Sequence, residues 1–177
     1  NDEFSNETGL TTIAVTDATI DATTLATVID SYDVINGVGT TGMTLASGAT
    51  IEVDASEITE MLADESAGRL TISDQVITVN SAATISVDTA NLLEATTTGV
   101  VTASIATTED VDELNTLTGT NGAYTIVVRT GDATTTTAAD LNTLNDKTTV
   151  AVDLTNVTAL AESSPSDLQT LATNISG

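Results

Sequence analysis

Cysteine, histidine and tryptophan are all absent from this chain of 177 residues. Without cysteine there is no disulfide framework, no zinc–thiolate site and no thiol nucleophile. Without histidine there is no conventional Ser-His or Cys-His catalytic pair and no imidazole ligand for a metal ion. These absences remove the commonest nucleophilic enzymes and transition-metal sites from consideration.

Basic side chains are scarce as well. Lys and Arg together number 3 against 26 Asp and Glu, which gives a net charge of −23. Such a surface repels nucleic acid and anionic membranes, because phosphate binding depends on clustered Lys and Arg. No run of the sequence approaches the ~20 apolar residues of a membrane span. We therefore expect no nucleic-acid partner and no insertion into a membrane.

Thr and Ala dominate what is present, with 39 and 23 copies, whereas the only aromatic residues are one Phe and two Tyr. A core without bulky aromatic rings must be built from small and branched side chains. Such a core suits thin, regular layers better than a bulky globule, which indicates a solenoid or a sandwich.

A capped-helix motif recurs every 27 residues in the C-terminal half. Its three copies are Asp110-x-x-Glu113-Leu114-Asn115-Thr116-Leu117, the segment from Thr137 to Leu144, and the segment from Ser164 to Leu171. Each copy has an N-cap residue, an acid three residues later that reaches back to the cap, and two Leu one turn apart. Weaker copies begin at Asp21, Asp54 and Asp88. Self-similarity of this period is typical of stacked architectures.

Short runs rich in Thr, Val and Ile lie between these segments and predict β-strands. They are residues 11–15, 50–53, 77–79, 84–87, 124–128 and 150–154. We predict a mostly β chain with short helices, a repeat or β-solenoid-like stack of strand–strand–short-helix coils, with Leu114, Leu141 and Leu168 buried along one line. An antiparallel β-sandwich is the alternative, although the two-residue hairpin turns that it needs are sparse.

The domain organisation follows from the same pattern. Residues 1–9 are polar, acidic and aperiodic, which predicts a flexible N-terminal arm. Residues 10–177 are then expected to form a single repeat domain of about six units, with helix caps near residues 21, 54, 88, 110, 137 and 164.

One segment carries a family resemblance. Residues 139–149, Ala-Asp-Leu-Asn-Thr-Leu-Asn-Asp-Lys-Thr-Thr, and the valine-rich run after them resemble the Thr/Ala/Asp-rich tandem repeats of large secreted or cell-surface proteins of marine bacteria, cyanobacteria especially. The rest of the chain follows that pattern loosely. The resemblance implies a structural role without a catalytic site.

Acidic clusters are the candidate binding sites. Calcium is the candidate ligand, because it takes several oxygen ligands on a flexible loop. The candidate metal ligands are Asp54, Glu57, Glu109, Asp110 and Asp112. None of these clusters matches an EF-hand loop or the Gly-Gly-x-Gly-x-Asp nonapeptide of calcium β-rolls, so helix caps on a solvated acidic face remain the alternative interpretation.

Catalysis is not expected. Pairs of acids suited to glycoside hydrolysis occur throughout the chain, but sugar-processing clefts usually offer aromatic platforms and basic residues. The three basic residues, Arg69, Arg129 and Lys147, are scattered over different units. We therefore predict that the chain is not an enzyme.

The expected function is that of a non-enzymatic extracellular structural protein, the subunit of a surface filament, sheath or layer. The last recognisable element is a helix from Ser164 to about Thr173, and no polar capping unit follows it, although terminal repeats need one for solubility. Open ends can stack head to tail, or the arm can add as a strand to a neighbour, so the expected partner is a second copy of the chain. The alternative is an adhesin or surface-protein repeat segment that binds a partner or calcium, since truncation of a larger protein explains open ends equally well.

Overall fold

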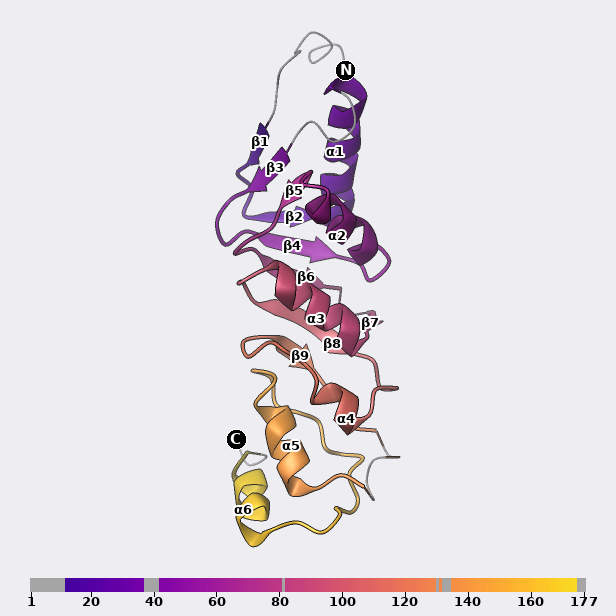
Figure 1. Cartoon of the computed structure of the whole chain (residues 1–177), viewed down its shortest axis with the longest axis vertical. Coiled ribbons are helices and arrows are strands. Elements are labelled where there is room, and N and C mark those ends of the chain that lie inside the picture. The colour runs from indigo at the N-terminus through magenta and orange to yellow at the C-terminus, as the bar shows by residue number, and fades with distance from the viewer. Residues whose placement is uncertain (1–11, 37–41, 81, 130, 132–134, 175–177) are drawn as a thin grey trace. The chain divides into compact units, whose positions relative to one another are not determined.

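The chain has an α/β fold in which parallel strands alternate with helices. A computed structural model describes residues 12–36, 42–80, 82–129, 131 and 135–174, and Figure 1 labels its elements. The arm predicted at residues 1–9 lies outside the described residues. Contacts within the chain divide it into two compact units: unit 1 is Asn1–Asn80 with Thr96–Gly99, and unit 2 is Ser81–Ala95 with Val100–Gly177.

Unit 1 contains two sets of parallel strands and two helices. Its elements are β1 (Thr12–Val15), β2 (Thr19–Asp21), α1 (Ala22–Asn36), β3 (Gly42–Leu45), β4 (Thr50–Val53), α2 (Ile58–Ser66), β5 (Leu70–Thr71) and β6 (Val76–Val79). One set has the order β1-β3-β5, and the other has the order β2-β4-β6. Ile20 lies opposite Ile51, and Ile51 lies opposite Ile77. Ile51 and Ile77 are fully buried, so this row forms the centre of the core of unit 1.

The end of α2 sets the position of the strand after it. Gly68 has a φ of 72°, a left-handed conformation that favours glycine. The Gly68 N–H donates to the Glu65 carbonyl and the Arg69 N–H donates to the Asp64 carbonyl, both at 2.9 Å. These bonds satisfy carbonyls of the last turn of the helix. They also hold Arg69 beside α2, immediately before β5 begins.

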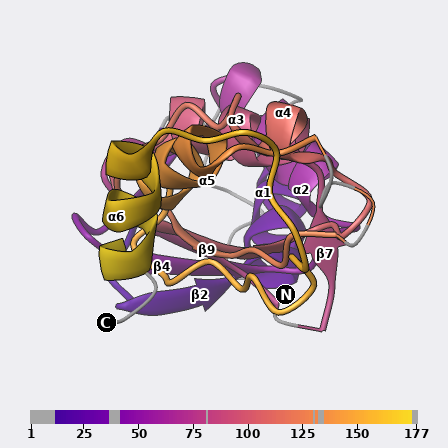
Figure 2. The ribbon, with the colours of Figure 1, turned by 90° about the horizontal axis from the view of Figure 1, so that it is seen from below.

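Unit 2 repeats the alternation of strand and helix. Its elements are β7 (Thr84–Ile85), α3 (Val87–Thr96, which ends at the boundary of the unit), β8 (Val101–Ile105), α4 (Val111–Leu114), β9 (Ala123–Thr125), α5 (Ala138–Asn145) and α6 (Pro165–Asn174). Both β7 and β9 pair with β8 in parallel. An isolated parallel bridge joins Val127 to Asp153, where the sequence predicted a strand at 150–154. Figure 2 shows α5 and α6 next to each other in this unit.

Three helices of unit 2 begin where the 27-residue motif places them. The α4 and α5 helices have complete capping boxes, at Asp110 with Glu113 and at Thr137 with Asp140. At α6, the Ser164 hydroxyl accepts from the Asp167 N–H at 3.1 Å. These capping hydrogen bonds satisfy N–H groups of the first turn, which helps to explain why such short helices form here.

The weaker copies of the motif have a different register. The cap of α3 is Ser86, whose hydroxyl accepts from the Thr89 N–H at 3.2 Å, and the predicted cap Asp88 lies within the first turn. The N-cap of α2 is Glu57 rather than Asp54. At α1, the Asp21 carboxylate accepts from the Thr24 N–H at 3.2 Å, as the motif predicts.

The predicted fold class is wrong. The described residues form an α/β fold with parallel strands and six helices, and more of them lie in helices than in strands. The arrangement is neither mostly β nor an antiparallel sandwich. The physical reason is that helices form between parallel strands, as α2 does between β4 and β6, because a strand followed by a crossover returns parallel to the first strand.

The predicted row of buried leucines is right for two members and wrong for the third. Leu114 is 1% exposed and Leu141 is 2% exposed, whereas Leu168 is 44% exposed. The same position in the motif is therefore covered in α4 and α5 but uncovered in α6.

Candidate functional site

Neighbouring helices in unit 2 are joined by asparagine side chains. The fifth residue after the caps at Ser86, Asp110 and Thr137 is Asn91, Asn115 and Asn142 respectively, of which Asn115 is the C-cap of α4. The Asn115 amide donates to the Asp140 carbonyl in α5 at 3.3 Å, and the Asn142 amide donates to the Asp167 carbonyl in α6 at 3.0 Å. We call this series the asparagine ladder. In each amide donation, the asparagine is the donor and the acceptor is a carbonyl about 25 residues later in the chain.

The first member of the ladder bonds to the segment that follows α4 rather than to the helix itself. The Asn91 amide donates to the Thr116 carbonyl at 3.1 Å, and the Asn91 side-chain oxygen accepts from the Thr118 N–H at 2.9 Å. The Asn142 oxygen accepts from the Asn174 amide at 3.2 Å. The Asn115 oxygen is buried and has no hydrogen-bond partner among the described residues. Asn115 is thus the least satisfied member of the ladder.

The α6 helix presents an uncovered apolar surface. Leu168 is 44% exposed, and Leu171 lines two open grooves of about 290 and 370 Å³ together with Leu141 and Leu154. Gln169, which stands where the ladder has asparagine, is exposed. We call Leu168, Gln169 and the two grooves the α6 face. Leu168 and Gln169 do not themselves line the two grooves, so the α6 face is a candidate surface that combines one exposed leucine with two neighbouring hollows.

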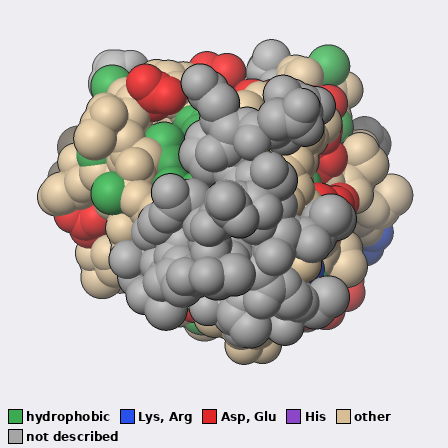
Figure 3. Space-filling view, turned by 90° about the horizontal axis from the view of Figure 1, so that it is seen from above, with side chains coloured by type: hydrophobic (Ala, Val, Ile, Leu, Met, Phe, Trp, Pro, Cys, Tyr) green, Lys and Arg blue, Asp and Glu red, His purple; other side chains and the backbone are tan. Residues whose placement is uncertain are grey.

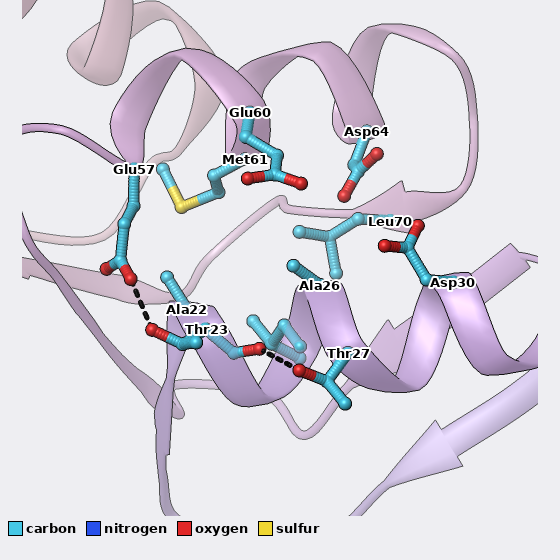
Figure 4. A pocket seen from close by; sticks show the side chains of 11 residues that line it. Ala22, Thr23, Ala26, Thr27, Asp30, Glu57, Glu60, Met61, Asp64 and Leu70 are labelled. Atoms are coloured by element: carbon cyan, nitrogen blue, oxygen red, sulfur yellow. Dashed lines mark hydrogen bonds between the residues drawn. The ribbon is translucent and has the colours of Figure 1, made fainter.

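A second cavity lies between α1 and α2 in unit 1 (Figure 4). It has a volume of about 220 Å³. Leu25, Met61 and Leu70 supply its apolar wall. Its acidic side chains are Asp30, Glu57, Glu60 and Asp64. Four of the eleven residues that line this cavity are therefore acidic.

Arg69 offsets much of that charge. Its guanidinium bonds to the buried Asp64 and, at 2.7 Å, to Asp33, and it lies 4.0 Å from Asp30. Burial raises the pKa of Asp64, and the positive charge of Arg69 offsets part of this rise. The hydrogen bond to Asp33 raises the pKa of Arg69 in turn. We call Arg69 with Asp30, Asp33 and Asp64 the arginine clamp, because it ties the second half of α1 to the end of α2.

The predicted metal ligands of unit 1 serve the local structure. The Glu57 carboxylate accepts from the Asp54 N–H at 3.0 Å and from the Thr23 hydroxyl of α1. The Asp54 carboxylate accepts from the Asn80 amide at 2.9 Å. Glu57 reaches the cavity between α1 and α2, whereas Asp54 is not among the residues that line it.

The predicted metal ligands of unit 2 lie at the start of α4. Asp110 caps the helix and lies 3.5 Å from the Arg129 guanidinium, which already supplies a positive charge. Asp110 and Asp112 line a cavity of about 220 Å³ together with Arg129 and Asp140. Burial raises the pKa of Glu109, and its hydrogen bond with Glu113 raises it further.

These carboxylates do not converge on one point. Within the described ranges, no group of three or more acidic side chains is arranged to hold a metal ion. Calcium binding therefore stays a prediction from the sequence. The bonds observed at Glu57 and Asp110 agree with the alternative interpretation of these acids as helix caps on an acidic surface.

The acidic surface is visible in Figure 3. Red carboxylate side chains are scattered over the described part of this face, and blue basic side chains occupy little of it. A search of the described helices for a long apolar stretch able to cross a membrane finds none.

Sequence reasoning missed both the asparagine ladder and the arginine clamp. The signal for the ladder was present, because Asn115 and Asn142 hold the same place in two copies of the motif and Gln169 holds it in the third. For the clamp the signal was the isolated Arg69 in a strongly acidic chain. Charge alone did not identify which acids it would meet, since Asp33 lies 36 residues away along the sequence.

Comparisons with models of known protein families, with curated proteins and with solved structures find no match to this chain. Its function must therefore be inferred from its own residues.

Proposed function

We propose that this chain is a non-enzymatic structural protein of the cell surface, whose copies associate into a filament, sheath or layer. The observation that carries the proposal is the α6 face. Leu168 is 44% exposed there, although its counterparts Leu114 and Leu141 are 1% and 2% exposed. The same position of the motif is buried in α4 and α5 and exposed in α6. The surface around Leu168 is therefore suited to bind another protein surface.

The energetics favour covering this face. Burial of apolar surface contributes roughly 25 cal/mol per Å², and the two grooves beside Leu171 offer further apolar area. Opposing this is the charge of −23 on every copy, which repels neighbouring copies. Dissolved salt screens such repulsion, and divalent cations bridge carboxylates. Association is therefore expected to depend on ionic strength.

Two observations support a structural rather than an enzymatic role. Three acids of the described cavities already have partners. Glu57 accepts a hydrogen bond from a threonine hydroxyl, Asp64 pairs with a guanidinium, and Asp110 caps a helix. The chain has no His or Cys to act as a nucleophile or general base. The extracellular location rests on the resemblance of residues 139–149 to secreted repeats.

The test is to follow the mass of the purified chain in two buffers. Sedimentation velocity and negative-stain electron microscopy are carried out at seawater ionic strength with calcium, and at low ionic strength with a chelator. We expect large species in the first buffer and a shift toward monomers in the second. A chain that stays monomeric at high concentration in the calcium-containing buffer would contradict the proposal and favour a partner-binding adhesin segment.

A further inference from the structure

The asparagine ladder has a fixed chemistry at each step. The donor is the side-chain amide of the fifth residue after the cap, and for Asn115 and Asn142 the acceptor is the carbonyl of the third residue of the next helix. These acceptors, Asp140 and Asp167, are also the residues whose N–H groups bind the caps Thr137 and Ser164. In these two steps, although not at Asn91, the asparagine amide thus binds the capped first turn of the next helix.

Burial of leucine accompanies each of these bonds. Leu114 and Leu141 immediately precede the donors Asn115 and Asn142, and both are at most 2% exposed. In α6 the corresponding pair is Leu168 and Gln169, where the leucine is 44% exposed. The Gln169 side chain bonds to none of the described residues, and it carries the same primary amide donor as asparagine on a side chain one methylene longer.

We propose that the α6 face binds helix α1 of a second copy of this chain, with the Gln169 amide donating to the main-chain carbonyl of Thr24. This inference rests on the proposed self-association and names the two surfaces that meet. The α1 helix has the capped first turn that the ladder recognises, because the Asp21 carboxylate accepts from the Thr24 N–H at 3.2 Å. Thr24 is exposed, and α1 is the first described helix of the chain.

The distribution of charge supports this pairing. No charged residue lies between Asp21 and Asp30 in the first two turns of α1, and none follows Asp167 in α6 as far as Asn174. In a chain with 26 acids, two uncharged helical segments can approach with little direct repulsion between facing side chains.

The direction of the ladder decides the type of assembly. Donor and acceptor lie on different helices, so the contact joins two unlike surfaces. Such a heterologous contact leaves one α1 and one α6 free at the ends of every open oligomer, and repeated addition gives open chains or closed rings rather than two-fold dimers.

The first test compares substitutions at adjacent exposed positions of α6. Gln169→Ala should weaken association about fivefold to tenfold, as expected for loss of one interfacial hydrogen bond. The matched control Thr170→Ala should stay within about twofold of the native chain, because Thr170 bonds within its own helix. Sedimentation equilibrium measures the association constant, and circular dichroism checks that the helices remain.

The second test identifies the partner helix. Because the chain has no Cys, single cysteines introduced by Thr24→Cys and Gln169→Cys can be mixed and joined by a short bismaleimide. We expect this mixture to give more cross-linked heterodimer than the control mixture of Thr24→Cys with Leu92→Cys, which places the second cysteine at an exposed position of α3. Equal yields, or a Gln169→Ala chain that associates like Thr170→Ala, would overturn the pairing while leaving self-association intact. A native chain that never associates would overturn both proposals.

Discussion

In unit 1 the neighbouring helices α1 and α2 are joined by charge, through Arg69 and the carboxylates of Asp33 and Asp64. In unit 2 the neighbouring helices α4, α5 and α6 are joined by the neutral amides of Asn115 and Asn142. Helices of four to ten residues are too short to be stable alone. The comparison shows that neighbouring helices of this chain are joined either by ion pairs or by hydrogen bonds from side-chain amides.

The two kinds of link between helices differ in which groups are left unpaired when the linking side chain is removed. A guanidinium that is removed from beside a buried carboxylate leaves an uncompensated charge, whereas an amide that is removed leaves unpaired dipoles. Unit 1 should therefore be the more sensitive to loss of its single linking residue, and unit 2 should lose stability in smaller steps.

The largest effect is expected from Arg69→Met. Asp64 is 3% exposed, and breaking a buried pair by removing one partner costs about 3–5 kcal/mol. Arg129→Met is the control, because Arg129 and Asp110 are 40% and 38% exposed at their side chains and an exposed pair contributes about 1 kcal/mol or less. Urea titrations measure both free energies of unfolding. Equal losses in the two variants would show that the clamp is no stronger than a surface ion pair.

The second largest effect on the free energy of unfolding distinguishes the buried Leu141 from the exposed Leu168 within unit 2. Leu141→Ala should cost about 2–5 kcal/mol, as for other buried leucines. Leu168→Ala should cost less than about 1 kcal/mol in the monomer, because an exposed surface position changes stability little. Thermal and urea unfolding at low protein concentration and low salt measure the two variants without association. Similar losses would mean that Leu168 is covered within the monomer.

A smaller effect is expected within the asparagine ladder. Asn142→Ala removes partners from the Asp167 carbonyl and the Asn174 amide, and unpaired buried groups cost about 1–3 kcal/mol. Asn115→Ala should cost less, because it also removes a buried oxygen that has no partner among the described residues. The difference in urea midpoint between the two variants is the measurement, and a larger loss for Asn115→Ala would contradict this ranking.

The smallest effect concerns a carboxyl of unit 2 and depends on pH. Burial and the neighbouring Glu113 raise the pKa of Glu109, and Asp88 adds to the rise, whereas the Val87 N–H opposes it. A raised pKa in the folded state means that ionisation of Glu109 opposes folding at neutral pH. Glu109→Gln should therefore stabilise the chain at pH 7, and this advantage should fade as the pH falls through the raised pKa toward the unfolded value. A difference that does not change with pH would argue against this assignment.

Local features of the fold could be predicted from the sequence. The caps at Asp110 and Thr137 were predictable because a capping box joins residues only three apart. The cap of α3 was placed two residues late, since Ser86 and Asp88 are both good capping residues and only the bond from the Thr89 N–H identifies Ser86. Strand propensity located β4 and β6 but did not show that they pair in parallel across α2.

Contacts between distant residues were beyond prediction from one sequence. The bonds of Asn115 and Asn142 each span 25 residues, and the bond of Arg69 to Asp33 spans 36. Such pairs depend on how the strands align, which composition and periodicity do not specify. The exposure of Leu168 was unexpected for the same reason, because its motif is nearly identical to that of the buried Leu141.

The most direct test of the structural role is a paired measurement of association. Leu168→Asp and Leu92→Asp each replace an exposed leucine of unit 2, 44% and 58% exposed, and each adds one negative charge. Sedimentation velocity in calcium-containing buffer of seawater strength should show that Leu92→Asp still assembles like the native chain and that Leu168→Asp remains monomeric. If both variants assemble alike, the α6 face is not the surface through which copies of this chain meet.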